Sequence, residues 1–162
     1  YTPSSFAALP RLLERAGRFH GAGSITGIYT VLVEGDDLHE PVSDHMRAIL
    51  DGHFVLSRDL ANQGHYPALD VLKSVSRLSG DLWTEAEQKL VRRVVRWLAV
   101  RERQLDMIEI GAYKAGSNPE LDVAVRLYPR LEQFLVQAPG ESMRRADMYA
   151  QLEAIAAEGG LS

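Results

Sequence analysis

Two patterns of hydrophobic and polar residues divide the chain near residue 82. Before that point, the β-branched apolar run GSITGIYTVLV (23–33) leads into the acidic turn EGDD and predicts a buried strand. The segment HFVLSRDL (53–60) predicts a shorter strand that runs into a helix. Helical spacing in residues 5–16 and 41–50 surrounds these strands with helices, an alternation typical of a parallel α/β sheet. Because two strands cannot form such a sheet alone, we expect that more of it precedes this sequence.

After residue 82 the spacing is helical. Thr84, followed three residues later by Glu87, forms a capping box. The apolar positions behind it share one helical face and comprise Leu90, Val91, Val94, Val95 and Leu98. Asn118 followed by Pro119 predicts the start of a second helix, and Pro129 predicts the start of a third.

A last amphipathic helix is predicted from about residue 141 to 157, through Tyr149 and Leu152. We therefore expect two domains. Residues 1–81 form part of an α/β domain with a parallel sheet, and residues 82–162 form a small all-α domain.

Composition narrows the classes of function. The chain has 162 residues, 46% of them hydrophobic, and a formal net charge of -4 with basic and acidic residues interspersed. That balance favours an ordinary globular protein and argues against nucleic acid as a partner. The absence of cysteine excludes a disulfide framework and is compatible with a reducing compartment, so we expect the cytoplasm.

Several catalytic signatures are absent from the sequence. It contains no G-x-x-x-x-G-K-[ST], no G-x-G-x-x-G and no G-x-S-x-G, so we expect no catalysis by these residues alone. The five histidines have no H-x-x-x-H or H-x-H spacing, and the acidic run at 34–40 lacks the spacing of a calcium loop. We predict no metal bound by protein ligands in this chain.

One arginine stands out because of its neighbours. In ALDVLKSVSRLSG (68–80), Arg77 lies among small, hydroxyl-bearing residues, and no acidic residue occurs within three positions of it. A surface arginine in a loop is one interpretation. A functional role for the guanidinium is the other, because charged residues rarely occur in so small and hydroxyl-rich a segment.

Three segments together resemble one protein family. GSITGIYTVLVEGDD, the stretch from HEPVSDH to SVSR, and IGAYKAGSNPELD are similar to the hexameric ATPases of flagellar export and type III secretion, relatives of the catalytic subunit of the rotary F-type ATPase. The resemblance implies that residues 1–81 are the C-terminal part of a RecA-like ATPase domain. The phosphate loop and catalytic glutamate would lie upstream, and residues 82–162 would be the helical C-terminal domain.

The resemblance also implies roles for individual residues. Arg77 of the S-V-S-R segment would be an arginine finger that reaches the γ-phosphate of ATP on the neighbouring subunit. Tyr66 of QGHYPALD would pack against adenine, and Phe134 of FLVQAP would form the other wall. The second aromatic residue of that wall in the relatives is replaced here by Ala138 and Pro139. A tyrosine packed at a turn and a core phenylalanine are the alternatives.

The acidic turn after the first predicted strand is a candidate interaction site. In the related rotary ATPases the matching loop lines the central hole and contacts the stalk. Here it carries Glu34, Asp36, Asp37 and Glu40, and six copies would form a negative ring. A solvated turn whose acids serve solubility is the alternative.

The function implied is a fragment of an export ATPase. The whole protein would bind ATP and Mg²⁺ through upstream residues and form a homohexamer. It would couple hydrolysis to chaperone release and unfolding of exported proteins. Its partners would be a central stalk protein, a peripheral stator-type protein, and export chaperones with their substrates, at the cytoplasmic face of the inner membrane. A non-catalytic subunit of a rotary ATPase and a helical interaction module without a nucleotide role remain open.

Overall fold

The computed structural model describes residues 3–18, 20–21, 23–33, 35 and 37–160. They belong to two compact units, Tyr1–His53 and Phe54–Ser162, which are described separately below. The domain boundary predicted at residues 81–82 lies inside the second unit and stays a prediction. Within the described residues, no helix is long and apolar enough to cross a membrane.

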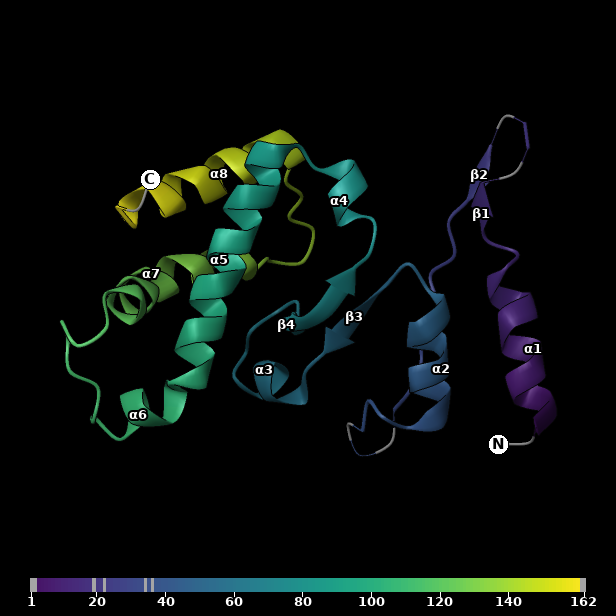
Figure 1. Cartoon of the computed structure of the whole chain (residues 1–162), viewed down its shortest axis with the longest axis horizontal. Helices are drawn as coiled ribbons and strands as arrows, with labels where there is room; N and C mark the ends of the chain where they lie inside the picture. Colours follow the sequence, from purple (N-terminus) through teal and green to yellow (C-terminus); the bar gives the residue numbers. More distant parts are fainter. Residues whose placement is uncertain (1–2, 19, 22, 34, 36, 161–162) are drawn as a thin grey trace. The chain divides into compact units, whose positions relative to one another are not determined.

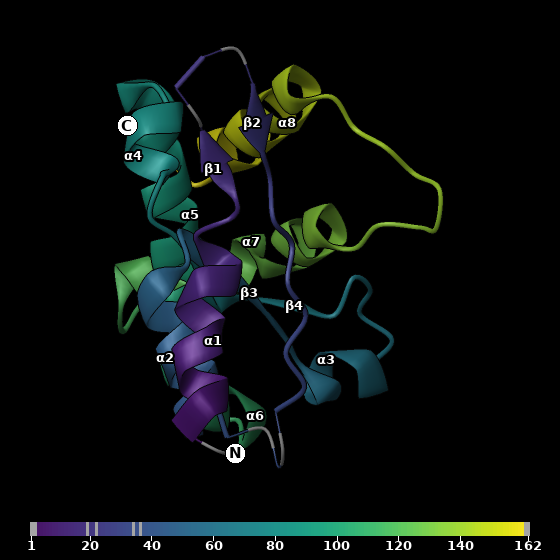
Figure 2. The same cartoon turned by 90° about the vertical axis from the view of Figure 1, so that its right-hand side faces the viewer.

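The first unit is organised around two helices. Helix α1 (Pro3–Leu13) contacts α2 (Pro41–Ile49), and both can be followed in Figures 1 and 2. Their buried contact joins Leu13 with Val42 and Met46. The structure thus confirms the two helices that the spacing of the sequence predicts in this region. The unit also contains strands β1 (Gly17–Arg18) and β2 (Ser24–Ile25), which pair with each other.

The long strand predicted at 23–33 is wrong in its extent. Only β2 (Ser24–Ile25) is strand there, and Ile28 and Leu32 are 90% and 89% exposed. The apolar run has strand propensity, but a strand also needs a neighbour for its N–H and C=O groups. Among the described residues, only β1 pairs with it. That ladder is antiparallel, because too few residues separate the two strands in sequence for a parallel crossover.

The second unit begins with a strand and a helix, as the sequence predicts. Strand β3 (Gly52–Leu56), whose first two residues still belong to the first unit, leads into α3 (Arg58–Asn62). Strand β4 (Leu69–Ser76) forms a two-stranded sheet with β3. The N–H of Ser57 donates to the C=O of Ala68 at 2.8 Å and closes the loop between the strands.

The rest of the second unit is helical. Its elements are α4 (Ser79–Leu82), α5 (Glu85–Arg103), α6 (Leu105–Glu109), α7 (Pro119–Leu135) and α8 (Arg145–Glu158). Helix α5 packs against both α7 and α8 (Figure 1). Trp97, Leu127, Leu131 and Ile155 are almost fully buried where these three helices meet. Burial of large apolar side chains of this kind is the main source of stability in such a bundle.

The predicted helix caps are confirmed. The Thr84 hydroxyl accepts the Glu87 N–H at 3.3 Å, and the Glu87 carboxylate accepts the Thr84 N–H at 2.7 Å. The Asn118 side chain accepts the N–H groups of Glu120 and Leu121 at the start of α7.

Two helix starts differ from the prediction. Pro129 lies inside α7 and does not begin a new helix. Its ring removes one backbone hydrogen bond and crowds the C=O one turn earlier, and the burial of Leu127 and Leu131 on either side offsets that cost. Helix α8 begins at Arg145 instead of residue 141, because Glu141 belongs to a turn in which its carboxylate accepts the Ala138 N–H at 2.9 Å.

Candidate functional site

Arg77 lies at the end of strand β4, in the turn that leads into α4, and it is exposed. The turn is well defined by hydrogen bonds. The Ser79 hydroxyl donates to the Ser76 C=O at 3.0 Å, and the N–H groups of Asp81 and Leu82 both donate to the Leu78 C=O at 3.1 Å. A guanidinium on a fixed turn is suited to bind an anion presented by a partner.

The serine before this turn has a structural role. The Ser74 hydroxyl donates to the Asp70 C=O at 2.6 Å and accepts the Val55 N–H at 3.0 Å. It therefore joins β3 to β4 where a larger side chain would separate them. At least one hydroxyl of this segment therefore stabilises the pairing of the strand that directly precedes Arg77.

Tyr66 is 55% exposed and precedes Pro67 through a cis peptide bond. Its C=O accepts the Gln137 N–H at 2.8 Å. This bond joins the loop before β4 to the segment that follows α7. The structure thus brings the QGHYPALD and FLVQAP segments together through the backbone.

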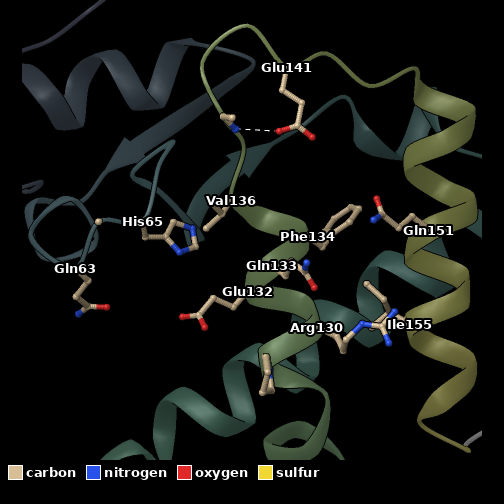
Figure 3. Close-up of a pocket in the computed structure, with 13 residues that line it drawn as sticks. Gln63, His65, Arg130, Glu132, Gln133, Phe134, Val136, Glu141, Gln151 and Ile155 are labelled. Atoms are coloured by element: carbon tan, nitrogen blue, oxygen red, sulfur yellow. Dashed lines mark hydrogen bonds between the residues drawn. The ribbon is translucent and has the colours of Figure 1, made fainter.

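A cleft of about 1140 Å³ lies between the loop after α3 and helices α7 and α8. In Figure 3, Phe134 points toward Gln151 of α8, and Val136 lies on the side of His65. Phe134 is half-buried and packs against the helical core. Tyr66 is not among the residues that line the cleft. The two aromatic residues expected to form the base site are therefore not walls of this one cleft, and the base contact stays a prediction.

Half of the acidic loop can be described. Glu34 and Asp36 lie outside the described residues. Asp37 is exposed, and its carboxylate accepts the His39 N–H at 2.9 Å. Its C=O accepts the N–H of Glu40, which directly precedes α2. The partial positive charge of a helix N-terminus stabilises an acidic side chain there. The acid of Glu40 therefore has a local structural role at the start of α2.

No set of three metal-ligating side chains occurs in the described part of the chain. We therefore assign no residue of the described chain to Mg²⁺.

Three hydrogen bonds to the α4 segment, which follows Arg77 in the chain, were not predicted. The side chains of Gln88 and Arg145 donate to backbone carbonyls of the α4 segment. Gln88 follows the capping box directly, and Arg145 begins α8, but neither position carries a motif. Only the fold brings them to the turn.

Comparisons with known proteins bear on both halves of the chain. The model of the ATP synthase alpha/beta family, nucleotide-binding domain, matches residues 1–76. The model of the T3SS EscN ATPase C-terminal domain matches residues 83–154. The flagellum-specific ATP synthase of Salmonella typhimurium is 51% identical over 156 residues, which are 96% of this chain and 34% of that protein. The chain belongs to the family of flagellar and type III secretion ATPases.

Solved structures agree with membership of this family. The assembled ATPase EscN from the type III secretion system of enteropathogenic E. coli matches with a TM-score of 0.90 and 36% identity, over 96% of this chain and 37% of that one. EscN in complex with its central stalk EscO matches with a TM-score of 0.85 and 35% identity, over 96% and 36% of the two chains. The family and the fold class predicted from the sequence are confirmed. The chain spans about a third of the length of these relatives.

Proposed function

We propose that the intact protein is an ATPase of flagellar export or type III secretion that acts as a homohexamer. It couples ATP hydrolysis at subunit interfaces to release of chaperones and unfolding of exported proteins. Support comes from the two family models, which match consecutive parts of the chain, and from the 51% identity to the Salmonella flagellum-specific ATP synthase over 96% of this chain.

The position of Arg77 carries the proposal. An exposed guanidinium on a hydrogen-bonded turn can reach a neighbouring subunit. There it would donate to the γ-phosphate of bound ATP and stabilise charge on the equatorial oxygens during phosphoryl transfer. Bound Mg²⁺ would neutralise phosphate charge and would be held by residues outside this chain. Residues 1–162 alone should not hydrolyse ATP.

Other residues complete the proposed interactions. Tyr66 packs against adenine, with Phe134 contributing from the adjoining segment. Asp37 and Glu40, together with Glu34 and Asp36, contact a central stalk, by analogy with EscN and EscO. Further partners are a peripheral stator-type protein, export chaperones and their substrates. The assembly acts at the cytoplasmic face of the inner membrane.

Arg77→Ala in the intact protein tests the proposal. An arginine finger acts in the transition state, so kcat should fall by about 10³-fold while nucleotide affinity changes little. Arg77→Lys should recover only part of the loss, because an ammonium lacks the planar fork. Steady-state turnover and equilibrium nucleotide binding, measured on assembled protein, separate the two effects.

A second measurement tests whether Arg77 acts on ATP that is bound by the neighbouring subunit. Hexamers assembled from mixtures of wild-type and Arg77→Ala subunits should lose activity at the interfaces to which the variant contributes its arginine. An unchanged rate for the pure variant would contradict the proposal. Nucleotide binding without hydrolysis by the wild type would instead indicate the non-catalytic subunit of a rotary ATPase.

A further inference from the structure

The short helix that follows Arg77 is held to the helical bundle by two side chains. Gln88 of α5 donates to the C=O of Gly80 at 2.9 Å and to the C=O of Trp83 at 3.1 Å. Arg145 of α8 donates to the C=O of Leu82 at 3.2 Å. All of these residues belong to the second compact unit.

These contacts supply hydrogen-bond donors that α4 lacks. A helix of four residues has too few internal hydrogen bonds to be stable alone, and its last carbonyls have no intrahelical donor. Gln88 and Arg145 supply those donors from two longer helices. Because both helices pack on the buried core around Trp97, α4 takes its position from the bundle.

Arg145 is itself fixed by a second bond. Its guanidinium donates to one Glu87 carboxylate oxygen at 3.0 Å, while the other oxygen accepts the Thr84 N–H at 2.7 Å. The cap of α5, the start of α8 and the end of α4 therefore form one hydrogen-bonded network. The Glu87 side chain is only 22% exposed, which shields the ion pair in part from water.

We propose that Gln88 and Arg145 are positioning residues for Arg77. The inference rests on the proposed role of Arg77 in phosphoryl transfer. Arg77 lies two residues before α4, and the turn between them is tightly hydrogen-bonded, so movement of α4 moves the backbone of Arg77. The helical bundle thus sets where the guanidinium stands, and a shift of the bundle would displace it.

The experiment is a double-mutant cycle on the intact, assembled protein. Gln88→Ala combined with Arg145→Ala is made in the wild type and in Arg77→Ala. In the wild type the pair should lower kcat by about 10-fold, with nucleotide binding unchanged. In Arg77→Ala it should lower kcat no further, because the side chain that it positions is gone. Arg145→Lys should restore part of the rate.

Arg144→Ala is the matched control. Arg144 directly precedes α8, pairs with Asp147 of that helix at 2.8 Å, and has a side chain that is 86% exposed, so turnover should not change. Gln88→Met keeps side-chain volume and removes the donor, and it decides the question if the alanine variants fail to fold.

The outcomes separate the two ideas. If Arg77→Ala leaves turnover unchanged, the proposed function is wrong. If Arg77→Ala lowers turnover but the variants of Gln88 and Arg145 do not, the positioning role is wrong. An equal loss in both backgrounds would also overturn that role, because the two residues would then act independently of Arg77.

Discussion

Tyr66 is the individual residue whose role can be tested most directly by binding. Its backbone is tied to the segment that contains Phe134 through the Gln137 N–H, and its ring is more than half exposed. Stacking of an aromatic side chain on a base contributes about 1–3 kcal/mol, so Tyr66→Ala in the intact protein should weaken ATP binding by about 5-fold to about 150-fold. Tyr66→Phe should bind normally. Fluorescent-nucleotide titration of the three proteins measures this, and equal affinities would assign Tyr66 to the turn alone.

Gly159 is a residue that the fold requires to be small. A Cβ placed there would lie 2.9 Å from the Trp97 ring at the buried end of α8. Gly159→Ala should therefore destabilise the protein by about 1–3 kcal/mol, the usual effect of overpacking a core. Gly80→Ala is the matched control, because nothing lies within 4 Å of the corresponding Cβ. Thermal unfolding of both variants compares them, and equal transition temperatures would contradict the packing argument.

At the scale of the elements, the capping box of α5 makes the stability of the protein depend on pH in the acid range. The hydrogen bond from the Thr84 N–H, with that from its hydroxyl and the charge of Arg145, lowers the pKa of Glu87 from its ordinary value of 4.5. A carboxyl group with a lowered folded pKa stabilises the fold above its unfolded pKa. This stabilisation is lost as the pH falls through the folded value.

Glu87→Gln should accordingly unfold at a lower temperature than the wild type near neutral pH. The difference should begin to shrink as the pH falls below 4.5, and it should be smallest below the lowered folded pKa, where the carboxyl is protonated in the folded protein as well. Glu153→Gln, at an exposed site on α8, serves as the control. Melting curves across the acid range test this, and a difference independent of pH would exclude Glu87 as the titrating group.

Elements with explicit local signals could be predicted from the sequence, whereas others could not. Thr84 and Asn118 are capping residues whose side chains act within three positions, so sequence order alone identifies their helices. Pro129 predicts a helix start from local sequence alone, but the burial of its neighbours in the core keeps it inside α7. The apolar run at 23–33 favours a strand, but a strand also needs neighbouring strands for its N–H and C=O groups, and the run itself does not specify them.

The loop before α7 shows how a family motif can be structural. In AYKAGSNPELD, the Asp122 carboxylate accepts the Tyr113 hydroxyl at 2.5 Å and the Gly116 N–H at 2.9 Å. Together with the Asn118 cap, these bonds fix the path from α6 to α7. This segment, one of the three that carry the resemblance to the family, therefore defines a turn.

At the scale of the whole molecule, the site is expected to be shared between subunits. Short motifs identify the family because they are local. The target of Arg77 would lie on another subunit, so a single chain shows the turn that holds the arginine but not the phosphate that it would meet. The contacts of Gln88 and Arg145 could not be predicted, because they join positions 8 and 63 residues apart through the fold.

The acidic loop gives the prediction for the assembly. Six copies of Asp36, Asp37 and their neighbours would surround a central stalk with negative charge and attract a basic partner. In the described part of the loop, the Asp37 side chain also accepts the His39 N–H, and an asparagine keeps that acceptor while it removes the charge. Asp36→Asn with Asp37→Asn should therefore preserve the turn and basal ATPase activity, but weaken stalk binding and stalk-stimulated turnover.

A salt series distinguishes this charge effect from a solvated turn. Wild-type binding to the stalk protein should weaken as salt shortens the screening length toward about 8 Å and below, whereas the double variant should respond less. Asp51→Asn, which removes an exposed charge of the first unit outside the loop, should behave as the wild type. Normal binding by the double variant at every salt concentration would mean that the loop acids serve solubility. Glu40 would then have only a local role, the favourable interaction of its charge with the N-terminus of α2.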